Sequence, residues 1–193
     1  TPMAEIMPLA KRYGLKVIED GAQAIGSKEG NAFACTIGDI GTLSFFPSKN
    51  LGCFGDGGAV VTNDDELADK LRRLRVHGTG KERYHYDMIG LNSRLDTLQA
   101  AILSVKLPHL ESWHAGRMRN AEKYDRLLAD VPELVRPHRL PGMRHIFNQY
   151  TVRVPRRDAL LARMKDEKIG ASVYYPLSLH LQQCFSAEGG KIG

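Results

Sequence analysis

The chain has 193 residues, of which 42% are hydrophobic and 25% charged, ordinary values for a soluble globular protein. Its net charge of +5 is spread over scattered pairs of Lys and Arg, a diffuse pattern that argues against nucleic-acid binding and leaves a mild attraction for anionic small molecules. No apolar run is long enough to span a membrane, so no membrane partner is expected, and no secretory signal is evident. Three cysteines without a CxxC spacing indicate neither a zinc site nor disulfides, and we expect a cytoplasmic protein with reduced thiols.

The first part of the sequence alternates strand and helix patterns. Apolar spacing predicts a helix over 3–13, and a second helix over 63–78 has Asn63 or Asp64 as its N-cap, acids in its first turn and arginines in its last. The β-rich runs bounded by glycine predict strands over 15–20, 41–46 and 58–62. We expect the first of these strands to be buried. Strands that alternate with helices indicate a layered α/β sheet.

The second part of the sequence predicts a long helix and then a smaller domain. Residues 79–93 look irregular, and a helical pattern runs over 95–130 with a kink or break at Pro108. A proline-rich linker is expected over 131–145. The remaining β-α-β pattern covers 146–155, 156–170 and 171–176. We therefore place one domain over 1–130 and a second, incomplete one over 131–193.

An acid stands at the end of the first predicted strand. Asp20 closes the run KVIED and is followed by a glycine. In open α/β sheets ligands bind at the carboxyl ends of strands, so a carboxylate here can face a cofactor. A turn or N-cap aspartate is the alternative interpretation.

Lys49 lies in the run SFFPSK, five residues after Ser44. An amine held among aromatic side chains is partly desolvated, which favours its neutral, nucleophilic form. Nucleophilic lysine chemistry means an imine with a carbonyl compound, and Ser44 with nearby backbone amides could bind a phosphate. An ordinary structural lysine is the alternative.

Two further features leave alternatives open. The glycine loop over 52–58 fits neither a P-loop nor a dinucleotide fingerprint, and we interpret it as a tight connection that lets backbone pass close to Lys49 or a ligand. Asn92 and Arg94 precede the long predicted helix, where an N-cap is one interpretation and a polar pair aimed at an anion is the other.

Several motifs in sequence order carry a resemblance to a known family. The stretches VIEDGAQAIGS, GDIGTLSFFPSKNLGCFGDGGAVVTNDDELADKLRRLRVHG and IGLNSRLDTLQAAILSVKL resemble the DegT/DnrJ/EryC1/StrS family of pyridoxal-phosphate-dependent sugar aminotransferases. The resemblance runs over residues 1–113 and more loosely to about residue 185. It implies the aspartate aminotransferase (type I) fold, with part of the large-domain sheet and part of a small α+β C-terminal domain.

The resemblance implies a role for each matching residue. Lys49 is similar to the lysine that holds pyridoxal 5'-phosphate covalently and then moves a proton, and Asp20 to the carboxylate that pairs with the pyridine nitrogen. Gln23 resembles a glutamine beside the ring oxygen of the cofactor. Ser44 resembles a phosphate-binding serine, and Asn92 an asparagine that reaches the phosphate in the neighbouring subunit's site.

The implied reaction is transamination of a nucleotide-linked keto-sugar with an amino acid donor such as L-glutamate, in amino-sugar or polysaccharide biosynthesis. A few relatives carry histidine in place of Lys49 and are dehydratases, so the lysine favours transamination. Shared sites imply a homodimer or a higher homo-oligomer. Arg94 and His180 could contact substrate, although ordinary surface or packing roles remain open for both. No metal site is implied.

The chain departs from the family at its ends. Family members carry a long N-terminal portion before AEIMPLAKRYGLKVIED, and the end of the small domain is also expected to be missing. We expect a piece of a longer protein, exposed sheet edges, and weak or absent cofactor binding by the chain alone. The alternative functions are a non-catalytic binding or assembly module and an unrelated nucleotide-binding module.

Overall fold

The computed structural model describes residues 1–188, which divide into two compact units. Unit 1 comprises Thr1–Val131 and Arg136–Thr151, and unit 2 comprises Pro132–Val135 and the chain from Val152 onwards. The sequence places a boundary between 130 and 131, whereas the structure packs 136–151 within unit 1. Residues 189–193, the end of the predicted second domain, lie outside the described residues.

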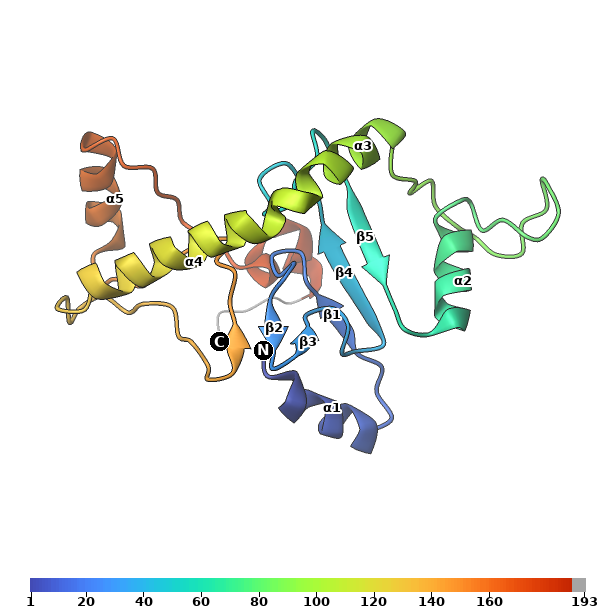
Figure 1. Ribbon diagram of the computed structural model, residues 1–193, viewed down its shortest axis with the longest axis horizontal. Coiled ribbons are helices and arrows are strands. Elements are labelled where there is room, and N and C mark those ends of the chain that lie inside the picture. The colour runs from blue at the N-terminus through green and yellow to red at the C-terminus, as the bar shows by residue number, and fades with distance from the viewer. Residues whose placement is uncertain (189–193) are drawn as a thin grey trace. The chain divides into compact units, whose positions relative to one another are not determined.

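Unit 1 combines two small sheets with helices (Figure 1). Its helical elements are α1 (Met3–Arg12), α2 (Asp65–Leu74), α3 (Thr97–Lys106), the 3₁₀ turn η1 (Leu107–His109) and α4 (Leu110–Leu127). Its strands are β1 (Ile18–Asp20), β2 (Lys28–Glu29), β3 (Ala32–Phe33), β4 (Ile40–Ser44), β5 (Gly58–Val61) and β6 (Met143–Arg144). Unit 2 contains α5 (Arg157–Asp166) and the 3₁₀ turns η2 (Leu179–Leu181) and η3 (Gln183–Glu188).

The helices of unit 1 form where the sequence predicts them. Asp64 caps α2, because its Oδ1 accepts hydrogen bonds from the backbone N–H groups of Glu66 (2.9 Å) and Leu67 (3.0 Å). The long helical pattern is broken at Pro108, which lies in η1 between α3 and α4. Figure 1 shows α3 and α4 running one after the other past the larger sheet.

The larger sheet has the strand order β1-β4-β5. β1 and β4 are parallel and pair Asp20 with Thr42, whereas β4 and β5 are antiparallel and pair Ser44 with Gly58. The parallel pair confirms the expected α/β character of the sheet. The smaller sheet, β3-β2-β6, is antiparallel and was not predicted, because its two-residue strands carry no alternating pattern.

The hydrophobic core joins the glycine loop to the long helices. Leu51 and Cys53 from the loop are buried against Leu103 of α3 and Leu110 of α4. The partly buried residues Ile25, Phe45 and Leu95 pack on this cluster. The segment that follows Lys49 is therefore anchored by apolar burial.

The edge of the larger sheet at β1 is open, contrary to the predicted buried strand. Ile18, in the middle of that prediction, is 66% exposed, and Leu15 just before β1 is 63% exposed. Apolar side chains at a sheet edge need a covering layer, which the described residues do not supply. The prediction that this strand is buried is therefore wrong, and the prediction of an exposed sheet edge with apolar surface is confirmed.

The predicted strands over 146–155 and 171–176 are wrong. Among the described residues, the first segment contains only an isolated bridge between Arg153 and Val135, and the second contains no strand. Phe147 has a φ of 47°, which interrupts an extended backbone, and Ile146 beside it is fully buried. The alternation over 146–155 thus reflects residues that anchor a loop in the core.

A polar network holds this loop on α4. The Tyr150 hydroxyl donates to Asp125 Oδ1 at 2.6 Å, and Arg139 forms an ion pair with Asp125 Oδ2. The Arg136 guanidinium donates to the Asp125 carbonyl at 2.6 Å, and the Tyr150 ring stacks on Tyr124. These contacts explain why 136–151 belongs to unit 1.

We expect Tyr150→Phe to lower the free energy of unfolding by about 1 kcal/mol at pH 8, because the partly buried Asp125 carboxylate loses one charge-assisted hydrogen bond. Burial and the hydrogen bond to Asp125 raise the pKa of Tyr150 to about 12. An unfolded tyrosine titrates near 10, so this stabilisation is complete below about pH 10 and disappears as the pH rises towards 12. Urea unfolding at pH 8 and pH 11 measures the difference.

The matched control is Tyr124→Phe, which removes a hydroxyl from the same ring stack. Its effect should be small and equal at both pH values. A Tyr150→Phe effect that did not shrink at pH 11 would contradict the hydrogen-bond explanation.

Candidate active site

The strand register brings two of the predicted site residues to one edge of the larger sheet. Asp20 is the last residue of β1 and pairs with Thr42 of the parallel strand β4. Ser44, two residues further along β4, is the last residue of that strand. The carboxyl ends of both strands therefore lie at the same end of the sheet, which is the position at which α/β sheets bind ligands.

The turn after β1 is rigid. The Glu19 carboxylate accepts hydrogen bonds from the backbone N–H groups of Cys35 (2.8 Å), Ile37 (2.7 Å) and Gly38 (2.6 Å). A Cβ at Gly21 would lie 1.9 Å from the Cys35 Sγ, so only glycine fits there. The neighbouring Asp20 carboxylate remains exposed to solvent.

Asp20 also makes the local contact that the alternative interpretation expected. Its Oδ1 accepts a hydrogen bond from the Ala22 N–H at 3.0 Å, the geometry of an Asx-turn. This bond occupies one of the two lone pairs of Oδ1. An ionised carboxylate has about four acceptor positions, so Asp20 can still meet a cationic ring nitrogen.

Lys49 lies in a closed turn that follows β4. Its backbone N–H donates to the Phe46 carbonyl at 2.9 Å, and the Cys53 N–H donates to the Phe45 carbonyl at 2.8 Å. A Cβ at Gly52 would lie 2.5 Å from the Pro47 carbonyl oxygen, so glycine permits this close backbone approach. The glycine loop thus acts as the predicted tight connection beside Lys49.

The side chains of Lys49 and Ser44 are both half-buried. Within residues 1–188 the Lys49 amine has no hydrogen-bond or ion-pair partner. The Ser44 hydroxyl accepts a bond from the Phe46 N–H at 3.3 Å, which leaves its proton available to donate. A hydroxyl donor therefore stands at the same end of the sheet as the Asp20 carboxylate, and an unpaired amine lies in the turn that follows β4.

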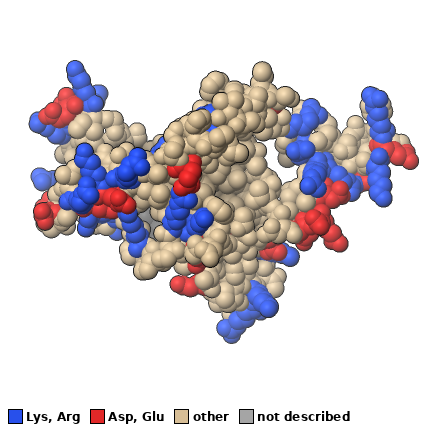
Figure 2. Space-filling view, in the orientation of Figure 1, with Lys and Arg blue, Asp and Glu red and all other residues tan. Residues whose placement is uncertain are grey.

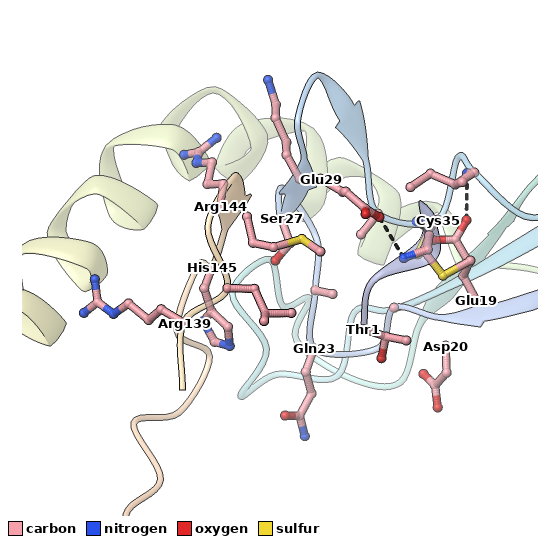
Figure 3. A pocket seen from close by; sticks show the side chains of 18 of the residues that line it. Thr1, Glu19, Asp20, Gln23, Ser27, Glu29, Cys35, Arg139, Arg144 and His145 are labelled. Atoms are coloured by element: carbon pink, nitrogen blue, oxygen red, sulfur yellow. Dashed lines mark hydrogen bonds between the residues drawn. The ribbon is translucent and has the colours of Figure 1, made fainter. Parts of the chain in front are cut away.

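A cavity of about 850 Å³ opens beside Asp20. Asp20 and Gln23 line one side, and residues 138–147 supply much of the opposite side, including Arg139 and His145 (Figure 3). Ser44 and Lys49 do not line this cavity. Asp20 thus lines the cavity and also stands at the carboxyl end of β1, next to the strand that ends at Ser44.

A buried histidine holds the Gln23 turn against α4. His114 is 1% exposed, and neither ring nitrogen has a hydrogen-bond partner within the described residues. A Cβ at Gly26 would lie 2.5 Å from its Cε1, so ring and glycine are in close contact. Burial lowers the pKa of His114, which keeps the ring neutral inside this contact.

The other predicted site residues lie elsewhere. Asn92 forms an isolated bridge with Val76, at the carboxyl end of α2. Its predicted N-cap role is wrong, because Asp96 is the N-cap position of α3. Arg94 is exposed in the same segment, and His180 is exposed in η2 of unit 2.

Sequence reasoning did not single out Glu19 or His145. Glu19 acts through backbone groups 16 to 19 residues away, and His145 reaches the cavity through a loop predicted to be a linker and a strand. Neither position has a local spacing that marks it. Only the pair of adjacent acids at the end of β1 gave a signal, and it pointed to Asp20.

The described part of the chain contains neither a metal-binding cluster nor a membrane-spanning helix. Residues 1–188 contain no group of three or more His, Cys, Asp or Glu side chains that could hold a metal ion. No helix among them is long and apolar enough to cross a bilayer. On the face shown in Figure 2, basic side chains lie beside acidic ones and form no continuous basic stripe.

The fold is that of part of a type I aminotransferase, and this defines the class of the protein. The chain belongs to the DegT/DnrJ/EryC1/StrS aminotransferase family, which it matches over residues 1–192. This confirms the family and fold class predicted from the sequence motifs.

Relatives and solved structures agree with the family assignment. A pleiotropic regulatory protein of Geobacillus stearothermophilus is 52% identical over 99% of this chain and 52% of its own length. A UDP-N-acetyl-3-dehydro-alpha-D-glucosamine 3-aminotransferase of Acidithiobacillus ferrooxidans is 47% identical over 95% of this chain and 49% of its own length. The chain therefore spans about half the length of these relatives.

Solved structures share the fold closely. DesV of S. venezuelae, solved with a ketimine intermediate, matches with a TM-score of 0.93 and 40% identity, covering 97% of this chain and 50% of DesV. A Brucella abortus aminotransferase of the same family matches with a TM-score of 0.92 and 43% identity, covering 96% of this chain and 49% of that protein.

Proposed function

We propose that this chain is part of a pyridoxal 5'-phosphate-dependent aminotransferase that acts on a nucleotide-linked keto-sugar with L-glutamate as the amino donor. The observation that carries the proposal is the pair of groups at one end of the larger sheet, the Asp20 carboxylate and the Ser44 hydroxyl, with the unpaired Lys49 amine in the turn that follows Ser44. These groups match, in chemistry, the pyridine nitrogen, the phosphate and the aldehyde of the cofactor. When bound, that cofactor supplies an electron sink.

The chain's own residues have separate tasks. The Asp20 carboxylate, presented by a strand end that Glu19 braces, keeps a ring nitrogen protonated. The Ser44 hydroxyl would donate a hydrogen bond to a phosphate oxygen, and Gln23 lines the same cavity as Asp20. The Lys49 amine would hold the cofactor's carbonyl carbon covalently and, when the substrate amine displaces it, would move the proton.

The remaining parts of the proposal concern partners. The segment that carries Asn92 packs at the end of α2, which suits a residue that serves the site of a second subunit in a homodimer or larger homo-oligomer. The open β1 edge and the half-length match support a chain that needs further sheet to complete its pocket. The three cysteines are free, in keeping with a cytoplasmic protein.

The test of the proposal is site-selective labelling. The whole protein, in which this chain is joined to the further sheet that completes its pocket, is incubated with pyridoxal 5'-phosphate, reduced with borohydride and digested with trypsin. A modified Lys49 blocks cleavage, so the label should appear on a peptide that spans 29–70, and the other lysines should remain unmodified. Label spread over many lysines, or none on this peptide, would overturn the proposal and favour a non-catalytic module.

A further inference from the structure

The wall of the cavity that faces Asp20 and Gln23 has its own rigid structure. Figure 3 shows His145 and Arg139 on this wall, on the opposite side of the cavity from Asp20. The wall is built from the loop that follows α4, and its residues Ile146 and Phe147 are 1% and 5% exposed. Buried neighbours therefore fix the backbone that carries His145.

Backbone strain is concentrated at the residue that orients His145. Phe147 has a φ of 47°, a left-handed conformation that is rare for a bulky side chain. Arg117 of α4 holds this conformation, because its Nη1 donates to the carbonyls of Phe147 and Asn148, both at 3.2 Å. Such strain persists only where surrounding contacts maintain it, and it often marks a functional site.

This conformation points the Phe147 N–H at the imidazole of His145. The N–H donates to His145 Nδ1 at 2.9 Å, and the two rings are in contact with centroids 4.2 Å apart. Because Nδ1 accepts a hydrogen bond, the ring proton is assigned to Nε2. His145 is exposed overall, and partial desolvation together with the nearby Arg139 lowers its pKa, which favours the neutral ring with its one proton on Nε2.

The other cations of this wall are already paired. Figure 3 shows the Arg139 and Arg144 side chains extending away from Asp20. Arg139 forms an ion pair with Asp125, and Arg144 forms one with Glu111. Within residues 1–188 the His145 Nε2 has no partner, so it is a polar group on this wall that is free to meet a ligand, and Phe147 fixes its orientation, whereas His138 on the same wall has no such contact.

We propose that His145 is a substrate-binding residue whose Nε2–H donates a hydrogen bond to an oxygen of the sugar ring, with Phe147 and Arg117 as its positioning residues. This inference rests on the proposed function. A neutral donor suits a hydroxyl or carbonyl oxygen, which carries no charge to neutralise. A phosphate would instead be met by the paired fork of an arginine, and both arginines here are engaged.

The test uses variants that separate the two ring nitrogens. His145→Asn keeps an acceptor near Nδ1 for the Phe147 N–H and removes the donor at Nε2. His145→Gln places an amide donor near the Nε2 position. The probes are UDP-N-acetylglucosamine and UDP, titrated by calorimetry into the whole protein that contains this chain, loaded with pyridoxal 5'-phosphate.

We expect His145→Asn to bind UDP-N-acetylglucosamine about tenfold more weakly than the unmodified chain and to bind UDP equally well. His145→Gln should recover part of the loss. The control is His85→Asn, in an exposed loop away from the cavity, which should change neither affinity. Thermal unfolding of His145→Asn should match that of the unmodified chain.

Three outcomes would overturn the inference. They are unchanged affinity for the sugar nucleotide in His145→Asn, an equal loss for UDP, which would indicate a phosphate contact, and no binding of either probe. Its failure is distinguishable from failure of the proposed function, because the labelling of Lys49 does not depend on His145.

Discussion

Replacing Lys49 by alanine is expected to abolish the absorbance of the lysine-bound cofactor near the visible edge. The same change should lower transamination in the assembled enzyme by about 10²–10⁴-fold, because both the covalent attachment and the proton carrier are lost. The unfolding free energy should change by less than about 0.5 kcal/mol, because the amine has no partner within residues 1–188. Absorbance titration with pyridoxal 5'-phosphate and urea unfolding measure the two effects.

The control is Lys70→Ala, an exposed lysine of α2. It should leave the absorbance titration unchanged. If Lys49→Ala retained the band, or if it unfolded the chain, Lys49 would be a structural lysine. The alternative interpretation of the SFFPSK run would then be correct.

A large loss of stability is expected for Gly41→Ala in β4. A Cβ at this position would lie 2.3 Å from the Cβ of Cys35 and 2.4 Å from its backbone oxygen. The clash involves backbone, so it cannot be relieved by rotating a side chain, and we expect a loss of about 3 kcal/mol in unfolding free energy. Gly41 pairs with Glu19, so the strain would also move the end of β1 that carries Asp20.

The matched control is Gly116→Ala in α4, where the nearest atom to a new Cβ outside the local helix backbone would be Arg119 Nη2 at 3.8 Å. This substitution should raise the unfolding free energy by about 0.5–1 kcal/mol, the difference in helix propensity. Urea unfolding compares the two variants. Equal effects from both would show that the contact between β4 and Cys35 is not tightly packed.

Local patterns were sufficient for much of the fold. The helix over 63–78 was predicted because an aspartate cap and graded charges are read within a few residues, and Asp64 caps α2 as expected. The strands over 41–46 and 58–62 were predicted from β-rich runs between glycines. β5 falls inside its predicted range, and β4 begins one residue before its range, at Ile40, and ends at Ser44.

Non-local contacts explain the failures. The alternation over 146–155 is typical of a strand, but Arg117, about 30 residues earlier, holds the backbone of Phe147 in a left-handed conformation. The strands of the smaller sheet are too short to leave a pattern, and they form because β6 reaches β2 from more than 110 residues away. No window of neighbouring residues contains that information.

The sequence alone determined the family, the approximate positions of three strands and the residue types of the candidate site, because motifs and glycine positions are local properties. The tertiary structure decided which of those residues lie together. The β1–β4 register brings Asp20 and Ser44 to the same end of the larger sheet, whereas Asn92 lies apart from them, beside the end of α2. The tertiary structure also decided that His145 faces the cavity. Burial and strand pairing depend on chain segments that meet only after folding, so local sequence could not specify them.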